Sequence, residues 1–184
     1  MTRLLLATGN AHKLDEVRHI LGPSFEVEAH DPGVEETGTT FEENALIKAR
    51  ALAAQRGEVA LADDSGIEID HLNGAPGIQS ARWTHEADWI PRVLRQLADA
   101  EPSQRGCRYV CAAAAVWPSG REVVVRGQVA GVIAAEPRGD GGFGYDPIVV
   151  PLEGDGRTFA EMSPQEKHLI SHRARAFRAL LRVL

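Results

Sequence analysis

The sequence predicts an α/β protein in which helices flank a mixed β-sheet. Helical and extended patterns alternate along most of the 184 residues, as is typical of this class. Two consecutive extended runs joined by Pro118, Ser119 and Gly120 indicate a long antiparallel hairpin in the middle of the chain. Because such a hairpin cannot belong to a purely parallel sheet, we expect strands of both directions. The length and the 43% hydrophobic content suffice for a single domain, residues 1–184, built as two lobes.

The first half of the chain alternates short apolar runs with helical patterns. Apolar residues recur with helical spacing over 11–21, and Gly22 with the following proline ends that helix. Thr40 and Glu43 have the spacing of a capping box, and the helix that they start ends at Gly57. The expected elements of this half are strands at 3–7, 25–29, 59–62 and 67–70, and helices at 11–21 and from the Thr40 cap to about 56.

The second half contains the hairpin and the last helical segment. A helix over 89–100 must carry Pro91 in its first turn, because proline is tolerated there. Ser163 and Glu166 form another capping-box pattern, with Pro164 at the first helical position. The expected strands are 108–117 and 122–135, which form the hairpin, and 148–150.

The last helical segment carries basic residues that cannot all face one ligand on an unbroken helix. Lys167 and His172 would lie ~140° apart at 100° per residue. Either only some of these residues share a ligand, or the helix breaks near Ile170 with Ser171 as a new cap. A solvated amphipathic helix with scattered charges is the alternative.

Charge and cysteine content exclude several classes of protein. The net charge of −6 argues against binding to a nucleic acid polymer, which needs a basic surface. The charge is uneven, because the chain from Arg157 onward carries +4 and the remainder −10. Cys107 and Cys111 would lie ~13 Å apart in a strand, too far for a disulfide, and reduced core cysteines favour a cytoplasmic protein. No run approaches ~18 apolar residues, so we expect no membrane span.

Two acidic stretches could bind a metal. A buried strand is expected to end at Asp63 and Asp64, whose side chains point to opposite faces, so only one faces a given cleft. A carboxylate at a strand end can bind Mg²⁺ or activate water, and an Asx turn capped by its own backbone is the alternative. Glu35 and Glu36 in the preceding loop are either solvated surface or the rest of an oxygen-rich magnesium site.

Two glycine-containing turns could approach a ligand. Residues 8–13 follow an apolar strand with a small polar turn and Lys13, which suits a phosphate but equally fits a strand-to-helix connection. Residues 139–144 formally match G-x-G-x-x-G, but an extended segment follows instead of a helix, so we reject a dinucleotide fold. The alternatives are a flexible loop with Phe143 or Tyr145 as a stacking surface, or a plain turn with buried aromatic residues.

Six stretches in order between residues 4 and 173 resemble the inosine triphosphate pyrophosphatase family. They are ATGNAHK, EETGTTFEENALIKA, ADDSGIEID, GAPGIQSARW, GGFGYDP and EKHLISHR. The resemblance implies two lobes around a nucleotide cleft and Mg²⁺-dependent hydrolysis of ITP, dITP or XTP to the monophosphate and pyrophosphate. It also implies a cytoplasmic homodimer that binds a purine nucleoside triphosphate as its small-molecule substrate.

The resemblance assigns site residues position by position. It implies that Asp64 is the catalytic proton acceptor and a metal ligand, with Glu35 as the second metal ligand and Glu36 as an alternative in register. The implied substrate contacts are Thr8, Gly9, Asn10, Ala11, His12, Lys13, Ser65, Phe143, Gly144, Tyr145, Asp146, Lys167, His172 and Arg173. If all of the last three contribute, the break near Ser171 must be real.

Two further functions are compatible with these motifs. The first is a broader nucleotide pyrophosphatase or phosphatase that uses the same metal chemistry, which product analysis distinguishes. The second is a nucleotide-binding regulator without activity. The acidic residues argue against it, because binding alone does not need a base at Asp64.

The resemblance also suggests how the base is selected. Hydrogen-bond donors at His172 and Arg173 would favour the 6-keto group of inosine and xanthine over the 6-amino group of adenine.

Overall fold

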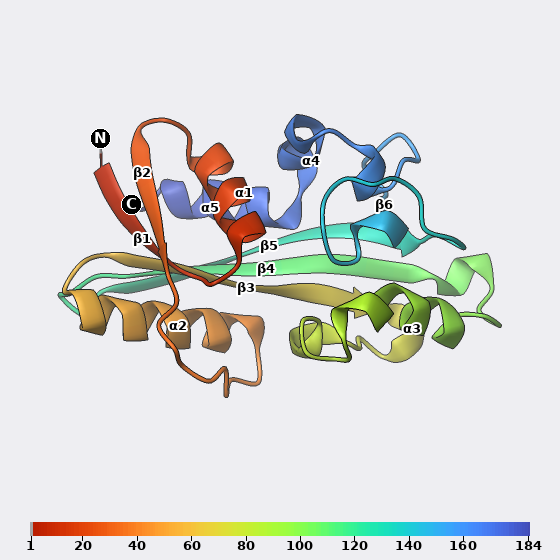
Figure 1. The fold of residues 1–184 in the computed structure, drawn as a ribbon, viewed down its shortest axis with the longest axis horizontal. Helices are drawn as coiled ribbons and strands as arrows, with labels where there is room; N and C mark the ends of the chain where they lie inside the picture. The colour runs from red at the N-terminus through yellow and green to blue at the C-terminus, as the bar shows by residue number, and fades with distance from the viewer. Residues whose placement is uncertain (1) are drawn as a thin grey trace. The chain divides into compact units, whose positions relative to one another are not determined.

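The computed structural model describes residues 2–184, apart from the side chain of Glu86, and contains a six-stranded sheet in the order β2-β1-β3-β4-β5-β6. Strand β1 runs parallel to β2 and β3, whereas β5 runs antiparallel to β6, so the sheet is mixed as predicted. The strands are β1 (Thr2–Ala7), β2 (Phe25–His30), β3 (Ala60–Ile69), β4 (Gly106–Val116), β5 (Glu122–Ile133) and β6 (Val149–Pro151). The helices are α1 (Ala11–Leu21), α2 (Phe41–Arg56), α3 (Trp89–Gln96), α4 (Pro164–Ile170) and α5 (His172–Leu181) (Figure 1).

The chain forms two compact units, each assembled from separate stretches. Unit 1 comprises residues 1–65, 111–127 and 172–184, and unit 2 comprises residues 66–110 and 128–171. Strands β3, β4 and β5 each contribute residues to both units. Each unit has a hydrophobic core of its own.

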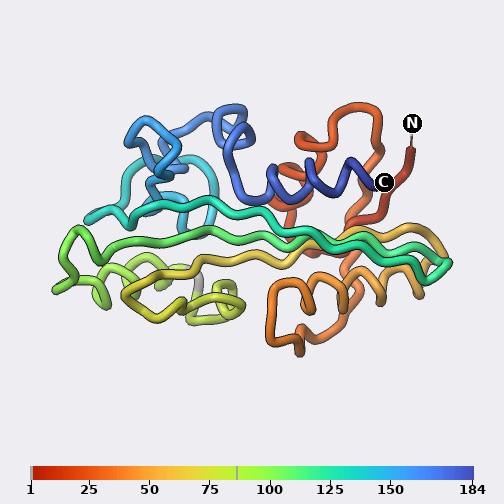
Figure 2. Tube along the Cα trace, turned by 180° about the vertical axis from the view of Figure 1, so that it is seen from behind, coloured from red at the N-terminus to blue at the C-terminus, as the bar shows by residue number. Residues whose placement is uncertain are grey.

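Unit 1 is a three-layer arrangement. Helices α1 and α5 cover one face of its strands and α2 covers the other, as the front and back views both show (Figures 1 and 2). Leu6 and Leu61 on the central strands pack with Val17 of α1 and Phe177 of α5, and all four are fully buried. Burial of these apolar side chains holds the N-terminal end of α5 over the strands, where His172 and Arg173 begin the helix.

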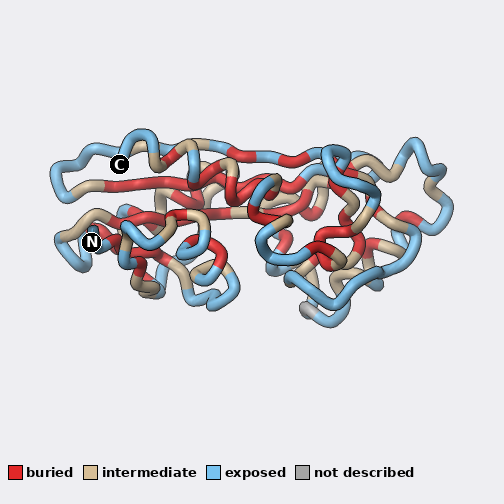
Figure 3. Tube along the Cα trace, turned by 90° about the horizontal axis from the view of Figure 1, so that it is seen from above, coloured by how far each residue is buried: buried red, intermediate tan, exposed pale blue. Residues whose placement is uncertain are grey.

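Unit 2 has a core that is rich in aromatic residues. Ile67 and Ile69 of β3 pack with Tyr109 of β4 and with Phe159, whose ring lies 5.7 Å from that of Tyr109 between centroids. Tyr145 belongs to the same core and stacks on Trp89 of α3 at 5.4 Å. Buried positions are concentrated along β3 and β4, whereas β5 alternates between buried and more exposed positions and most loop residues are exposed or intermediate (Figure 3). None of the helices described in residues 2–184 is long and apolar enough to cross a membrane.

Most predicted elements are confirmed, and the prediction of two short strands around the acidic pair is wrong. Strand β3 runs unbroken from Ala60 to Ile69, so Asp63 and Asp64 lie within a strand and not at its end. Helix α3 ends at Gln96, four residues before the predicted end at 100. The wrong prediction followed from charged residues and a glycine, which disfavour strands unless tertiary contacts compensate.

Of the alternatives that the sequence left open, the break near Ser171 is the one that the structure shows. Helix α4 begins at the Ser163 capping box, in which the Ser163 hydroxyl accepts from the Glu166 amide and the Glu166 carboxylate accepts from the Ser163 amide. It ends at Ile170, its C-cap Ser171 has an extended backbone with φ −63° and ψ 151°, and α5 starts at the next residue. Lys167 consequently belongs to unit 2, whereas His172 and Arg173 belong to unit 1.

Candidate active site

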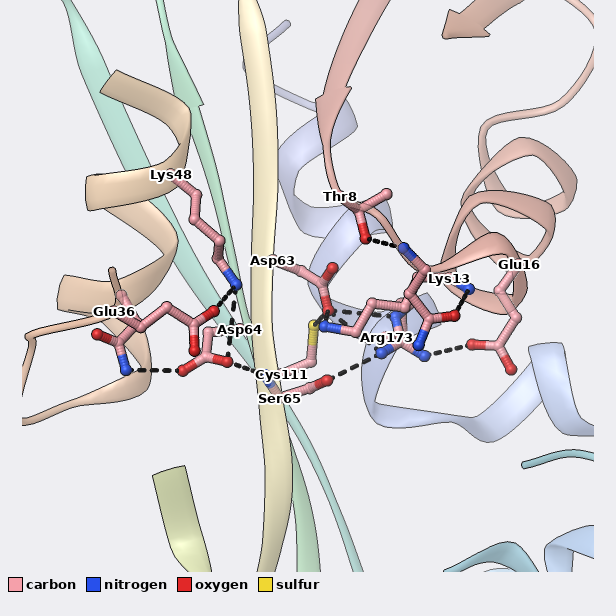
Figure 4. Close-up of polar contacts among 12 residues, drawn as sticks. Thr8, Lys13, Glu16, Glu36, Lys48, Asp63, Asp64, Ser65, Cys111 and Arg173 are labelled. Atoms are coloured by element: carbon pink, nitrogen blue, oxygen red, sulfur yellow. Dashed lines mark hydrogen bonds and ion pairs between the residues drawn. The ribbon is translucent and has the colours of Figure 1, made fainter. Parts of the chain in front are cut away.

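The acidic pair of β3 lies beside the end of a shorter strand. Leu6 of β1 pairs with Leu61 of β3, and β1 ends one residue later, whereas β3 continues for eight residues beyond Leu61. Asp63 and Asp64 therefore lie where the β1 edge of β3 becomes open. Their side chains point to opposite faces of the strand, as expected from its two-residue period (Figure 4).

Asp63 faces α1 and α5 and is surrounded by cations. Its Oδ2 atom lies 3.1 Å from Lys13 Nζ and 3.2 Å from Arg173 Nη2. Burial alone would raise the pKa of Asp63, but attraction by Lys13 and Arg173 outweighs it, and the pKa lies well below its usual value. Asp63 is therefore a permanent anion that fixes the position of both cations (Figure 4).

Arg173 is buried on the same face of β3 and contacts several polar side chains. Its side chain is only 1% exposed, and its guanidinium forms ion pairs with Asp63 and with Glu16 of α1 and donates to Ser65 Oγ at 2.9 Å. The predicted role of Arg173 and Ser65 was direct substrate contact. In this structure Arg173 directs its donors at Asp63, Glu16 and Ser65, which suits a residue that positions the strand. His172 is also buried.

Asp64 faces α2 and lies in a different environment. Asn44 Nδ2 donates to its Oδ2 at 3.1 Å, the Ser65 amide donates to its Oδ1 at 3.0 Å, and Lys48 Nζ lies 3.8 Å from Oδ1. Burial raises the pKa of Asp64, Lys48 opposes that shift and Glu36 adds to it, and the net direction is upward. A carboxylate with a raised pKa is a stronger proton acceptor than an ordinary aspartate, which suits a general base.

The loop before α2 is joined to Asp64 through Asn44. The Gly38 amide donates to Asn44 Oδ1 at 2.8 Å, and a Cβ at Gly38 would lie 2.6 Å from that oxygen, so only glycine permits this approach. The joined loop places Glu36 against Lys48, whereas Glu35 is exposed. The structure thus brings the alternative residue of the predicted pair, Glu36, to the neighbourhood of Asp64.

Asn44 and Lys48 were missed by the sequence analysis. They are four residues apart, so they share one face of α2, and Asn44 is fully buried. Two polar residues four positions apart on a buried helix face were the signal that could have identified them. The sequence analysis used only the capping box of this segment. Thr40 does cap α2, since its hydroxyl accepts from the Glu43 amide at 3.1 Å.

The predicted phosphate turn lies between β1 and α1. Asn10 is the N-cap of α1, where its Oδ1 accepts from the Lys13 amide at 3.2 Å, and its own amide donates to Thr8 Oγ1 at 3.1 Å. The remaining predicted residues, Gly9, Ala11 and His12, are exposed. Amides at a helix N-terminus next to a lysine suit an anion, so this turn could bind phosphate oxygens.

The predicted substrate contacts at 143–146 and Lys167 form a separate cluster in unit 2. Lys167 Nζ lies 2.7 Å from Asp146 Oδ2, which also accepts from the Phe143 amide at 2.8 Å. Tyr109, which the sequence analysis did not select, donates to Asp146 Oδ1 at 3.1 Å. Lys167 Nζ lies 4.8 Å from the centre of the half-buried Phe143 ring. The turn at Gly144 connects these residues, with φ +64°.

Tyr145 does not serve as the predicted stacking surface in this structure. It is 4% exposed, its ring stacks on Trp89, and its hydroxyl donates to the Ser80 carbonyl at 2.9 Å. Of the two aromatic residues proposed for stacking, only Phe143 is partly accessible.

The oxygen donors near Asp64 could hold a hard cation. Among the side chains that the structure describes, no group of three or more from histidine, cysteine, aspartate and glutamate converges as a metal site. Glu36 and Asp64 nevertheless flank one position, which the Lys48 ammonium occupies. Mg²⁺ typically takes one or two carboxylates from a protein while phosphate oxygens and water complete its coordination, so this donor set is sufficient.

Comparisons with known proteins agree with the motifs. The model of the Ham1 family matches residues 4–183. The dITP/XTP pyrophosphatase of Streptomyces coelicolor is 50% identical, with 100% of this chain and 98% of that protein covered. The dITP/XTP pyrophosphatase of Symbiobacterium thermophilum is 52% identical, with 95% and 90% covered.

Solved structures give the same assignment. The structure of a HAM1 protein from Coxiella burnetii is 40% identical and superposes with a TM-score of 0.85, covering 100% of this chain and 98% of that chain. A nucleoside-triphosphatase (dITP/XTP pyrophosphatase) from Mycobacterium abscessus is 44% identical with a TM-score of 0.77, covering 98% and 99%. The family resemblance seen in the six motifs is thereby confirmed, and the chain belongs to the Ham1 family.

Proposed function

We propose that this protein hydrolyses nonstandard purine nucleoside triphosphates, namely ITP, dITP and XTP, to the nucleoside monophosphate and pyrophosphate. The observation that carries the proposal is the acidic pair of β3. It sets one permanent anion beside Lys13 and one proton-accepting carboxylate beside Lys48 and Glu36. The names of the relatives, dITP/XTP pyrophosphatase, supply the substrate class.

The residues of unit 1 divide the chemical work between binding and proton transfer. The turn at 8–13 binds phosphate oxygens, because the N-terminus of α1 is exposed there and Lys13, which is 16% exposed and paired with Asp63, lies beside it. Asp64 accepts a proton from the attacking water, since burial raises its pKa and Asn44 fixes the orientation of its carboxylate. Asp63 and Arg173 hold Lys13 and Ser65 in place.

We further propose that the metal is Mg²⁺, held by Asp64 and Glu36. The fit rests on the donor set, because two carboxylates already share one cationic partner at this position. When bound, Mg²⁺ would neutralise negative charge on the phosphate oxygens. Glu35, the first choice from the sequence, is exposed in the same loop.

Three assignments implied by family membership remain predictions. The first is recognition of the nucleotide by the loop at 143–146, which would bind the base, and by Lys167, His172 and Arg173 as the remaining contacts. The second is the homodimer. The third is a cytoplasmic location, which the two buried free cysteines suit.

A panel of nucleotides tests the reaction and the substrate class together. With Mg²⁺ present, ITP, dITP and XTP should be cleaved with kcat/KM at least about a hundredfold above that for ATP, because a site that pairs with a 6-keto group loses those bonds with adenine. Chromatography should detect the monophosphate and pyrophosphate. Release of single phosphate would reject the reaction, and equal cleavage of ATP would reject the substrate class in favour of a broad nucleotide pyrophosphatase.

Replacement of Lys13 by alanine is expected to weaken substrate binding with little effect on chemistry. The variant should raise KM for ITP about tenfold, since a charge-assisted bond to a phosphate contributes about 1.5–3 kcal/mol. Steady-state kinetics measures KM and kcat separately. Arg3→Ala removes a cation of the same unit that pairs with Glu28 at the surface and serves as the control. An unaltered KM for Lys13→Ala would contradict the phosphate role.

A further inference from the structure

Lys48 lies where two carboxylates converge. Its ammonium is 2.5 Å from Glu36 Oε1 and 3.8 Å from Asp64 Oδ1, and its side chain is only 13% exposed. The lysine comes from the middle of α2, whereas Glu36 comes from the loop and Asp64 from β3. Three separate segments of unit 1 therefore bring one cation and two anions to a single position (Figure 4).

We propose that Lys48 is an internal competitor for the divalent cation and holds its position between Glu36 and Asp64 in the free protein. The inference rests on the proposed function, because it assigns a role to a residue of that same site. A cation that bridges the two carboxylates must displace the ammonium, since the two positive charges cannot share this space. The free protein therefore binds metal weakly.

The displaced ammonium needs a new anionic partner. A lysine side chain has four flexible methylene groups and carries a compact charge, so it can move without disturbing α2. The phosphate oxygens of a nucleotide provide such a partner, whereas a metal ion that arrives alone brings none. Lys48 thus makes metal binding favourable chiefly when the metal arrives together with a triphosphate, which couples the two binding events.

The test measures metal binding by the free protein, without nucleotide and without turnover. Mn²⁺ serves as the probe, and the electron paramagnetic resonance signal of unbound Mn²⁺ gives its dissociation constant. Lys48→Met keeps an unbranched side chain, one atom shorter, and the helix propensity, but removes the charge. We expect Lys48→Met to bind Mn²⁺ about tenfold more tightly than the wild type, because it removes a competing cation that lies 2.5 Å from Glu36 and 3.8 Å from Asp64.

Two matched variants separate displacement from a general charge effect. Arg50→Met removes a cation from the same helix, where Arg50 pairs with Glu122 at the surface, and should leave the dissociation constant within about twofold. Lys13→Met removes a cation that contacts Asp63 and not Asp64, and should tighten Mn²⁺ binding by less than Lys48→Met does. Lys48→Gln repeats the test with a neutral polar side chain in case Lys48→Met folds poorly.

Three results would overturn the proposal. They are an unchanged dissociation constant in both Lys48 variants, weaker Mn²⁺ binding in them, or a gain no larger than that of Lys13→Met. These results are independent of the nucleotide panel, so failure of the substrate assignment and failure of the Lys48 proposal can be told apart.

Discussion

Asp64→Asn should lower kcat for ITP by about a thousandfold, the middle of the range for loss of a general base. The amide has the shape of the carboxylate and can still pair with Asn44 after rotation, but it cannot accept a proton from water. Lys13 and the turn at 8–13 face Asp63 and are untouched by the change, so the variant should retain substantial ITP binding. Steady-state kinetics gives kcat, and calorimetric titration gives the dissociation constant.

A second aspartate variant provides the control for Asp64→Asn. Asp155 is exposed and pairs with Arg157 in unit 2, so Asp155→Asn should keep wild-type kcat. Turnover by Asp64→Asn at the wild-type rate would eliminate Asp64 as the base. Loss of binding together with loss of turnover would show that the carboxylate is needed mainly to hold the substrate.

Asp63→Asn should lower the free energy of unfolding by about 3 kcal/mol, the lower end of the cost of breaking a buried ion pair. Asp63 is the shared anion of Lys13 and Arg173, and its replacement leaves the guanidinium of a fully buried arginine with one fewer counter-charge. Urea unfolding at neutral pH measures the loss. The expected loss of unfolding free energy is larger than that caused by most surface substitutions, which change it by no more than about 0.5 kcal/mol.

The pH dependence gives this prediction a definite sign. The pKa of Asp63 is lower in the folded protein than in the unfolded chain, so its contribution is complete above the unfolded value of about 3.9 and is lost as the pH falls towards the lower folded value. The difference between the wild type and Asp63→Asn should therefore shrink below about pH 4. Glu122→Gln, which breaks a surface pair with Arg50, is the control. A difference that stays constant from pH 7 to below about pH 4 would contradict the ion-pair explanation.

Local signals predicted most elements of the fold. The bounds of α1 and the start of α4 follow from caps and turn residues whose effects reach only a few positions, such as Gly22 and Ser163. The continuity of β3 could not be predicted in this way. Asp63 and Asp64 remain in a strand because Lys13, Arg173, Asn44 and Lys48 compensate them, and each of these residues is distant in the sequence.

The candidate site was predictable only where one segment carries the whole signal. The turn at 8–13 and the acidic pair of β3 stand out in the sequence because each combines a strand with polar residues. The choice between Glu35 and Glu36 could not be made, since a loop has no period that assigns side chains to a face. Which of the two glutamates faces Lys48 depends on the hydrogen bond from the Gly38 amide to Asn44 Oδ1, which fixes the loop against α2.

The opposite orientation of Asp63 and Asp64 has a consequence for how this segment can change in length. Inserting or deleting one residue between Ala60 and Asp63 would exchange the two sides of the strand, because each side chain would turn to face the partners of its neighbour. Asp64 would then meet the cations of α1 and α5, and Asp63 would meet Asn44. The buried residues that precede Asp63 can therefore be exchanged for others of similar size, whereas their number cannot change by one without moving both carboxylates.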